Sequence, residues 1–425
     1  MIVHVVKPGE TMWRIATNYG TTVASIMSAN GFTSDALVPG LALAIPSGSA
    51  YTVRQYTVSV GDTLWSISRQ FGITLELLLA YNPPLSPHGL IPGQILLVPI
   101  AVTAKRWIET NAYLVLSNVG QDDQWISAFS SYLTFVSPFT YTFTAAGIVK
   151  PAAVIMPSLA SVKYLLVLAN SDATGQFSGD LAHQVFVNPQ SRQTLIDGLI
   201  AELRRLGYSG VNLDIEHIYP ADRYLYNDFV AQVAASLRAL GYAITIAVPP
   251  KPNDDPYNEW VGGFDYKALG DVVDRVMLMT YDWGFPAGKP EAVAPVDKIR
   301  AVLNYALSLM DSRKVLLGMP LYGDDWPLPH TPIHPATIIG NQNAVANAIA
   351  QGAWINVDPL SVTPNYMYYD ARGTSRIVWY NDSLTILAKA ELVMEYDMAG
   401  FFYWALGYDF PQNWYLLNDV FDIIK

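Results

Sequence analysis

The sequence predicts an α/β chain in which a (β/α)8 barrel of the TIM type, with a small α+β insertion, follows two small βααβ modules. Strand-like and helical segments alternate from residue 104 to residue 425, and the first hundred residues contain an internal repeat. The 425 residues, 51% hydrophobic and 14% charged, suffice for several packed domains. This composition is that of a globular protein and excludes disordered and fibrous chains.

The repeat defines one module over residues 1–47 and another over 51–100. The matched segments are His4-Val5-Val6-Lys7-Pro8-Gly9-Glu10-Thr11-Met12-Trp13 with Tyr56-Thr57-Val58-Ser59-Val60-Gly61-Asp62-Thr63-Leu64-Trp65, then Asn30 with Asn82 and Pro39-Gly40 with Pro92-Gly93. Each unit reads as a strand, a turn with a helix N-cap, two short amphipathic helices, and a Pro-Gly turn into a closing strand. Residues 47–50 and 101–105 are expected to be linkers.

This repeat resembles the LysM module, a small domain that binds N-acetylglucosamine-containing glycans such as peptidoglycan and chitin. The resemblance implies a sugar groove between the first turn and the Pro-Gly loop of each unit. The implied contact residues are Gly9, Glu10, Thr11, Met12, Pro39 and Gly40 in the first module, and Gly61, Asp62, Thr63, Leu64, Pro92 and Gly93 in the second. These glycines and prolines could instead serve only as turn residues. Trp13 and Trp65 are expected in the module cores, and tandem weak modules would raise avidity along a polymer.

Eight apolar, strand-like segments follow the modules and predict the barrel. They are residues 112–117, 132–136, 164–169, 210–215, 243–248, 275–281, 314–320 and 400–406. The clearest helical patterns lie between them, at residues 191–206 and 223–240. Because catalytic groups of such barrels lie at the carboxyl ends of the strands, the site is expected there.

The fourth of these strands carries two carboxylates at its carboxyl end, Asp214 and Glu216. Residues two apart on a strand share a face and lie roughly 6.5–7 Å apart, so both acids are expected in one pocket with Asn212. Two acids this close favour one that keeps its proton and acts as a general acid while the other stays ionised. The alternative from the strand alone is a pair of acids that cap the next helix.

The barrel region resembles glycoside hydrolase family 18, the chitinase-like group. The motifs that carry the resemblance are Ser209-Gly210-Val211-Asn212-Leu213-Asp214-Ile215-Glu216, Met279-Thr280-Tyr281-Asp282, Gly318-Met319-Pro320-Leu321-Tyr322-Gly323 and Trp404, in the family's order. With the two modules in front, the whole chain resembles the spore cortex-lytic N-acetylglucosaminidases of endospore-forming bacteria.

The resemblance implies a role for each site residue. Glu216 would protonate the glycosidic oxygen, and Asp214 would hold the 2-acetamido group, whose carbonyl oxygen attacks the anomeric carbon. Tyr281 would orient that carbonyl oxygen, and this substrate-assisted route is an exception to the usual two-carboxylate scheme. The implied substrate-binding residues are Asn212, Met279, Asp282, Tyr322 and Trp404. From the residues alone, Trp404 could equally be a barrel-core aromatic and Tyr281 a buried tyrosine with a backbone partner.

Two positions depart from the family pattern, because Ser209 and Asn212 replace acids. A neutral Asn212 behind Asp214 would leave Asp214 more firmly ionised. Since Asp214 and Glu216 are intact, we interpret the chain as an active enzyme.

Residues 325–380 are expected to form an insertion that walls one side of the cleft, with packing roles favoured for Trp379 and Tyr380. His330 and His334 are four apart, but the prolines around them disfavour the helix that a metal site of this spacing needs. His217 is expected to point away from Glu216. We therefore expect neither a metal nor a cofactor.

Charge and composition limit the partners. The net charge of −11 disfavours nucleic acid, and the absence of cysteine excludes disulfides and thiolate metal sites. No signal peptide and no membrane-spanning run is evident. The expected partner is peptidoglycan or another GlcNAc polymer, met by a monomer associated with the spore cortex, the spore coat or the cell wall.

Two classes of function follow from these patterns. One is a retaining β-N-acetylglucosaminidase of peptidoglycan, and the other is a glycan-binding structural protein whose barrel has lost activity. A chitinase is a further alternative, because the sequence does not decide between chitin and cortex peptidoglycan.

Overall fold

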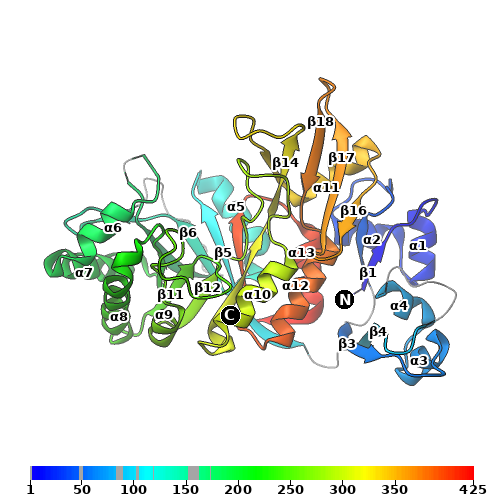
Figure 1. Cartoon of the computed structure of the whole chain (residues 1–425), viewed down its shortest axis with the longest axis horizontal. Helices are drawn as coiled ribbons and strands as arrows, with labels where there is room; N and C mark the ends of the chain where they lie inside the picture. The colour runs from blue at the N-terminus through cyan, green and yellow to red at the C-terminus, as the bar shows by residue number, and fades with distance from the viewer. Residues whose placement is uncertain are drawn as a thin grey trace.

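The computed structural model describes residues 2–46, 51–82, 90–101, 105–117, 119–151, 162–172 and 174–425. The expected linker at residues 47–50 and most of the one at 101–105 lie outside these ranges. Figure 1 shows a barrel with the two modules at its side and the insertion standing above both. No helix among the described residues is long and apolar enough to cross a membrane.

The described residues contain a closed barrel of eight parallel strands. Its neighbours follow chain order, and the last strand pairs with the first. The strands are β5 (Arg106–Val115), β6 (Phe135–Phe139), β9 (Lys163–Ala169), β10 (Gly210–Asp214), β11 (Ala243–Val248), β12 (Arg275–Leu278), β13 (Val315–Pro320) and β19 (Gly400–Leu406). The predicted fold class is therefore confirmed. A short C-terminal strand, β20 (Phe421–Ile423), extends the sheet beside the start of β5.

Helices cover the outside of the barrel. They are α5 (Val119–Phe129), α6 (Gly179–Phe186), α7 (Pro189–Leu206), α8 (Arg223–Arg238), α9 (Tyr266–Val272), α10 (Val296–Ala306), α12 (Ser383–Glu395) and α13 (Pro411–Val420), with short 3-10 turns η1 (Ser130–Tyr132), η2 (Pro220–Asp222) and η3 (Ser312–Lys314). Helix α7 shows why the sequence forms these elements. Its side-chain cap is Asn188, Pro189 occupies the first turn, and Gly207 ends it with φ at +70°.

Side chains point alternately to the two faces of each strand and so form two apolar layers. On β9, Leu166 and Leu168 belong to the layer between strands and helices, whereas Leu165 and Val167 belong to the cluster in the barrel interior. On β10, Val211 and Leu213 take the outer layer. The polar residues between them, starting with Asn212, are thereby directed to the barrel axis.

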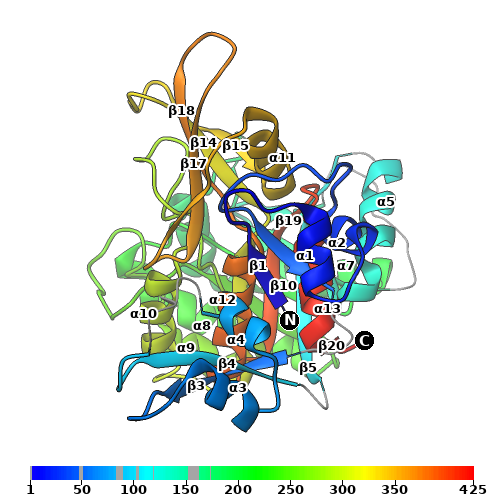
Figure 2. The ribbon, with the colours of Figure 1, turned by 90° about the vertical axis from the view of Figure 1, so that its right-hand side faces the viewer.

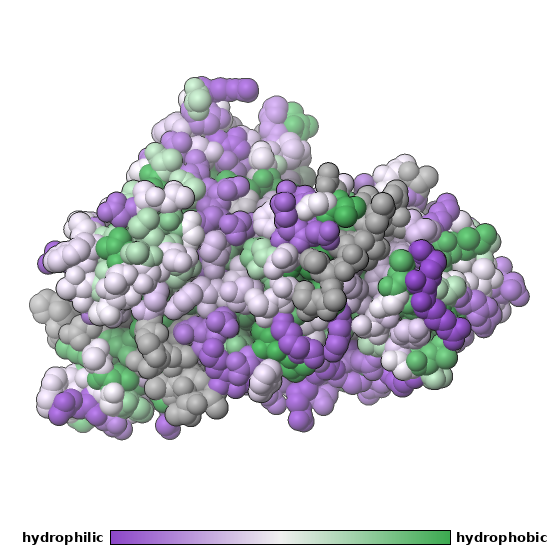
Figure 3. Space-filling model, turned by 180° about the vertical axis from the view of Figure 1, so that it is seen from behind, coloured by the Kyte–Doolittle hydropathy of each residue, from purple (hydrophilic) through white to green (hydrophobic). Residues whose placement is uncertain are grey.

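The insertion is a five-stranded antiparallel sheet with one helix. Its elements are β14 (Tyr322–Pro327), β15 (Thr337–Gly340), α11 (Asn341–Gln351), β16 (Asn356–Asp358), β17 (Thr363–Tyr369) and β18 (Ser375–Trp379). Seen from behind, its tip is hydrophilic, and hydrophilic and hydrophobic residues alternate over the rest of that face (Figure 3). A minor hairpin, β7 (Thr142–Phe143) with β8 (Val149–Lys150), lies after β6.

Both modules have the expected strand–helix–helix–strand order. Module 1 consists of β1 (Ile2–Val5), α1 (Met12–Asn18), α2 (Val23–Asn30) and β2 (Ala42–Ile45); module 2 consists of β3 (Tyr51–Thr57), α3 (Leu64–Gln70), α4 (Leu75–Ala80) and β4 (Ile95–Ala101). Thr11 and Thr63 cap the first helices through their side chains. Asn30 and Asn82 each bridge the second helix to the closing strand by three hydrogen bonds of 2.7–2.8 Å.

Module 1 is packed against the rest of the chain. Gln412 of α13 donates to Asn30 Oδ1 at 2.8 Å, and Gln342 of α11 donates to the carbonyl of Gly31 at 2.9 Å. One apolar cluster joins residues of module 1, the insertion, and Leu77 and Tyr81 of module 2. Figure 2 shows module 1 between the insertion above and module 2 below.

Candidate active site

A cleft of about 500 Å³ opens at the carboxyl ends of the barrel strands. Six of the predicted residues line it. These are Asp214, Glu216, Met279, Tyr281 and Asp282, joined by Trp404 from the last strand. The cleft thus gathers side chains from β10, from the segment after β12, and from β19, which are far apart in the sequence.

Strand β10 delivers the two carboxylates. It ends at Asp214, and the buried Ile215 belongs to the outer apolar layer, which leaves Glu216 on the same side as Asp214. The backbone of Glu216 is fixed by Asn170, which accepts from the Glu216 amide at 2.9 Å and donates to its carbonyl at 2.8 Å. This bidentate contact sets the position of the second acid once the strand has ended.

The structure corrects the prediction for Asn212. This residue is buried and does not line the cleft. Its Oδ1 accepts from the hydroxyl of Tyr113 at 2.6 Å, and its Nδ2 donates to Oγ1 of Thr245 at 2.8 Å. Asn212 therefore bridges Tyr113 and Thr245 below Asp214 and Glu216, and its side chain is not exposed in the cleft.

Burial dominates the electrostatics of the acid pair. It raises the pKa of Asp214 to about 7, and burial together with the charges of Asp214 and Asp282 raises the pKa of Glu216 to about 8. No described group donates a hydrogen bond to Asp214 Oδ1, which is buried. Burial therefore favours the protonated form of Asp214, and the expected effect of a neutral Asn212 on its ionisation stays a prediction.

Tyr281 and Asp282 follow β12, which is two strands along the barrel from β10, and line the same cleft. Burial raises the pKa of Tyr281 far above its ordinary value, so its phenol stays a neutral hydrogen-bond donor. Asp282 has φ at +62° and accepts a hydrogen bond from the hydroxyl of Tyr322. Tyr322 itself is buried and does not line the cleft, so its predicted substrate contact is replaced by a contact to Asp282.

Aromatic side chains form the floor and the rim. Trp404 packs edge-on against Tyr113 and Phe139, with ring centroids 5.3 and 5.2 Å apart. At the rim, Trp260 lies 4.8 Å from the ring of His217, which also stacks on Phe177. His217 is thus a rim residue in contact with cleft-lining aromatics.

Several residues of this site were not predicted. Tyr113, Phe139, Phe177 and Trp260 lie outside the recognised motifs, yet all four line the cleft. Asn170 directly follows β9, and a polar residue at the end of a barrel strand is a signal that could have identified it.

Asp324 on β14 was also missed. It is fully buried, and neither of its carboxylate oxygens has a described hydrogen-bond partner. Burial and the neighbouring charge of Asp282 raise its pKa to about 7. The acids near the cleft are therefore held in a poorly solvated environment in which protons are retained.

The structure gives a mixed result for the predicted glycan contacts of the modules. Met12 is buried in the core of module 1 and offers no side chain to a ligand. Glu10 and Asp62 use their carboxylates inside the turn, where they accept from the amides of Lys7 and Ser59 at 2.7 Å.

The two tryptophans behave opposite to the prediction. Trp13 and Trp65, expected in the cores, are 70% and 64% exposed. On α1 the buried stripe consists of Met12, Ile15 and Ala16, so the residue after Met12 faces outward.

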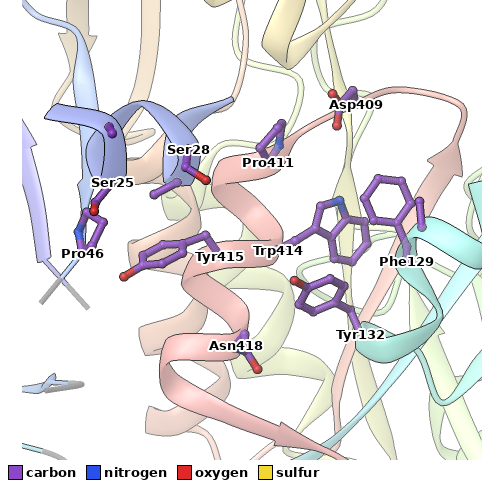
Figure 4. Close-up of a pocket in the computed structure, with 13 residues that line it drawn as sticks. Ser25, Ser28, Pro46, Phe129, Tyr132, Asp409, Pro411, Trp414, Tyr415 and Asn418 are labelled. Atoms are coloured by element: carbon purple, nitrogen blue, oxygen red, sulfur yellow. The ribbon is translucent and has the colours of Figure 1, made fainter. Parts of the chain in front are cut away.

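A larger hollow of about 690 Å³ lies between α2 of module 1 and α13 of the barrel. Figure 4 shows Ser25 and Ser28 of module 1 on one side and Trp414, Tyr132 and Phe129 on the other. Trp414 is stacked on Phe129 at 4.7 Å. Asp409 is the one acid among its described lining residues, and the hollow lies apart from the cleft that holds Asp214 and Glu216. No group of three or more candidate metal ligands occurs among the described residues.

Residues 118–409 match the sequence model of glycosyl hydrolases family 18, and residues 4–46 and 56–99 match the LysM domain. The chain belongs to glycosyl hydrolase family 18 and carries two LysM domains. It is 34% identical to the cortical fragment-lytic enzyme of Bacillus subtilis (strain 168) over 87% of this chain and 98% of that protein. The cortical fragment-lytic enzyme of Bacillus cereus is 32% identical over 99% and 98% of the two chains.

A solved structure gives the same result in three dimensions. The Bacillus cereus spore cortex-lytic enzyme SleL superposes with a TM-score of 0.84 at 31% identity, covering 100% of this chain and 98% of that one. The resemblance inferred from the motifs is therefore confirmed over the full length of the chain.

Proposed function

We propose that the protein is a retaining β-N-acetylglucosaminidase that cleaves GlcNAc linkages in spore cortex peptidoglycan. One observation carries the proposal: Asp214, Glu216 and Tyr281 line one cleft, and the buried Asp214 Oδ1 lacks a described donor. Because Asp214 lines the cleft, its carboxylate can accept the N–H of a 2-acetamido group. The relatives named as cortical fragment-lytic enzymes support cortex as the polymer.

Glu216 acts as the general acid and later as the base. Because burial raises its pKa to about 8, it holds a proton at neutral pH and can pass it to the glycosidic oxygen. The same residue then takes a proton from water during breakdown of the intermediate. The clamp from Asn170 holds the backbone that carries this carboxyl.

Asp214 and Tyr281 grip the acetamido group. Asp214 accepts the amide N–H, and Tyr281 donates its hydroxyl to the carbonyl oxygen, which then attacks the anomeric carbon. Holding that oxygen at attack distance supplies several kcal/mol of barrier lowering, about 7–11 kcal/mol in the best intramolecular cases. Because Asn212 is neutral and buried, it cannot form a glycosyl ester.

The remaining cleft residues position the sugar. Trp404 supplies an apolar face for the ring, with Met279 beside it, and Asp282 accepts from sugar hydroxyls. Trp260 and Phe177 at the rim extend this apolar surface for neighbouring sugars. The LysM domains hold the enzyme on the polymer, and the chain works as a monomer in association with the cortex, the coat or the wall.

The test is a reducing-end assay on purified cortex peptidoglycan, with chitin as the second polymer. We expect products ending in N-acetylglucosamine from cortex, and no cleavage when the glucosamine at the cleaved bond is de-N-acetylated. A thiazoline mimic of the cyclic intermediate should inhibit competitively. Preferred cleavage of chitin would identify a chitinase, and equal turnover of acetylated and deacetylated glycan would refute the acetamide mechanism.

A further inference from the structure

The two LysM modules build the same pair of loops. In module 1, the amide of Gly40 donates to the carbonyl of Val6 at 2.8 Å, and in module 2 the amide of Gly93 donates to the carbonyl of Val58 at 2.8 Å. Both glycines have φ near +90°, at +87° and +88°. The loop after the first strand and the Pro-Gly loop are therefore joined in the same way in both modules.

The surroundings of the Pro-Gly loops differ. The carbonyl of Pro39 accepts from the amide of Ile355 in the insertion at 3.0 Å. A Cβ at Gly40 would lie 1.9 Å from the carbonyl oxygen of Ile355, so the insertion packs directly on this loop. By contrast, no described atom lies within 4 Å of a Cβ built at Gly93.

Side-chain exposure shows the same asymmetry. Val38, which precedes Pro39, is 5% exposed and belongs to the apolar cluster shared with the insertion. Its counterpart Ile91, which precedes Pro92, is 70% exposed. Val60, in the first loop of module 2, is 88% exposed. The two modules thus share their internal structure but differ at equivalent loop positions, which are covered in module 1 and exposed in module 2.

Module 1 is also fixed in place. Its contacts to Gln412 and Gln342, together with the shared cluster, hold it against α13, α11 and the insertion. Opening the Pro39–Gly40 side to a polymer would require that this interface separate. Burial at about 25 cal/mol per Å² of apolar surface makes such separation costly.

We propose that residues 59–62 and 91–94 of module 2 form the glycan-binding surface of the two LysM domains. Module 1 then has a structural role, packed between module 2 and the insertion. The inference rests on the proposed function, in which the LysM domains hold a GlcNAc polymer. Exposed apolar side chains beside open backbone turns suit an N-acetyl sugar, which presents a methyl group and an amide together. The covered loop of module 1 offers no such surface.

The experiment compares single substitutions in the full-length chain. Val60→Asp and Ile91→Asp alter module 2, and Pro8→Asp, at the position matching Val60, and Ala36→Asp alter exposed positions of module 1. Binding to insoluble peptidoglycan and to chitin beads is measured by sedimentation, with Glu216→Gln in every protein to prevent digestion. We expect at least tenfold weaker binding for each module 2 variant and less than a twofold change for the module 1 variants.

Folding and function are checked in the same proteins. All four positions are exposed, so melting temperatures should agree, and with Glu216 restored each variant should cleave soluble fragments normally. Equal loss of binding in the module 1 variants, or retained binding in the module 2 variants, would overturn this inference but leave the proposed function of the LysM domains standing. If the unmodified modules bound neither polymer, the proposed LysM function would fail, and the inference with it.

Discussion

Replacing Glu216 with glutamine is expected to abolish hydrolysis and also to stabilise the folded chain above about pH 5. Glu216 has an ordinary pKa of 4.5 and a folded-state pKa of about 8, and burial is the main cause of the difference. At 1.36 kcal/mol per pH unit, ionising this carboxyl in the folded chain costs at most about 5 kcal/mol. Glutamine has no ionisable group, so the folded variant does not lose this free energy as the pH rises.

The sign of the effect depends on pH. Below the unfolded pKa of 4.5 the carboxyl is neutral in both states, and the two proteins should be equally stable. Between pH 4.5 and 8 the folded state binds more protons than the unfolded state, so the unmodified chain loses stability as the pH rises. Above pH 8 the difference should stay constant. Part of it is shared with Asp214, so an observed gain of about 2–4 kcal/mol is expected.

Chemical denaturation at pH 4.5, 6, 7.5 and 9 measures this profile, and the exposed Glu259 provides a matched control as Glu259→Gln. The control should follow the unmodified chain at every pH. A Glu216→Gln protein that is no more stable than the unmodified chain at pH 9 would refute the assignment of Glu216 as a partly buried, proton-retaining acid. Residual activity of a tenth or more in a folded variant would remove it from catalysis.

Three further outcomes test the site. Activity on soluble fragments should fall as the pH rises through about 8, because Glu216 must be protonated to act as the acid; a fall that begins below pH 6 would contradict this. Tyr281→Phe should lower kcat about 10²-fold with a small effect on KM and none on melting, and a change confined to KM would assign it to binding alone. Asn212→Leu should destabilise the chain by about 1–3 kcal/mol in urea, because the hydroxyls of Tyr113 and Thr245 lose their partner, whereas an unchanged midpoint would show that the bridge is dispensable.

The barrel could be predicted from sequence because its buried strands are continuous apolar runs that end in polar residues. Strand β10 shows this, since its ladder ends at Asp214 as predicted to within one residue. The start of β5 was missed. Residues Arg106 and Glu109 interrupt the apolar pattern, and the strand extends to them because β20, near the C-terminus, pairs with Arg106–Ile108.

The place of Asp214 and Glu216 in the cleft could be predicted for the same reason, but their surroundings could not. The bridge from Asn212 to Tyr113 joins residues 99 positions apart, and the register that brings them together is set by closure of the barrel. The pattern of neighbouring residues in the sequence cannot predict a contact between side chains so far apart in the chain. Trp13 is different, because the stripe of Met12, Ile15 and Ala16 was present in the sequence and excluded it from the core.

The cluster that joins module 1 to the insertion has a consequence for synthesis of the chain. Ile45 leaves the ribosome long before Ala344, with roughly 300 residues between them. At about 5–20 residues per second, the apolar face of the first module waits on the order of 15–60 s for its partner. During that interval Val38 and its neighbours are open to chaperones and to other nascent chains. Module 1 is thus made well before the insertion that completes its packing.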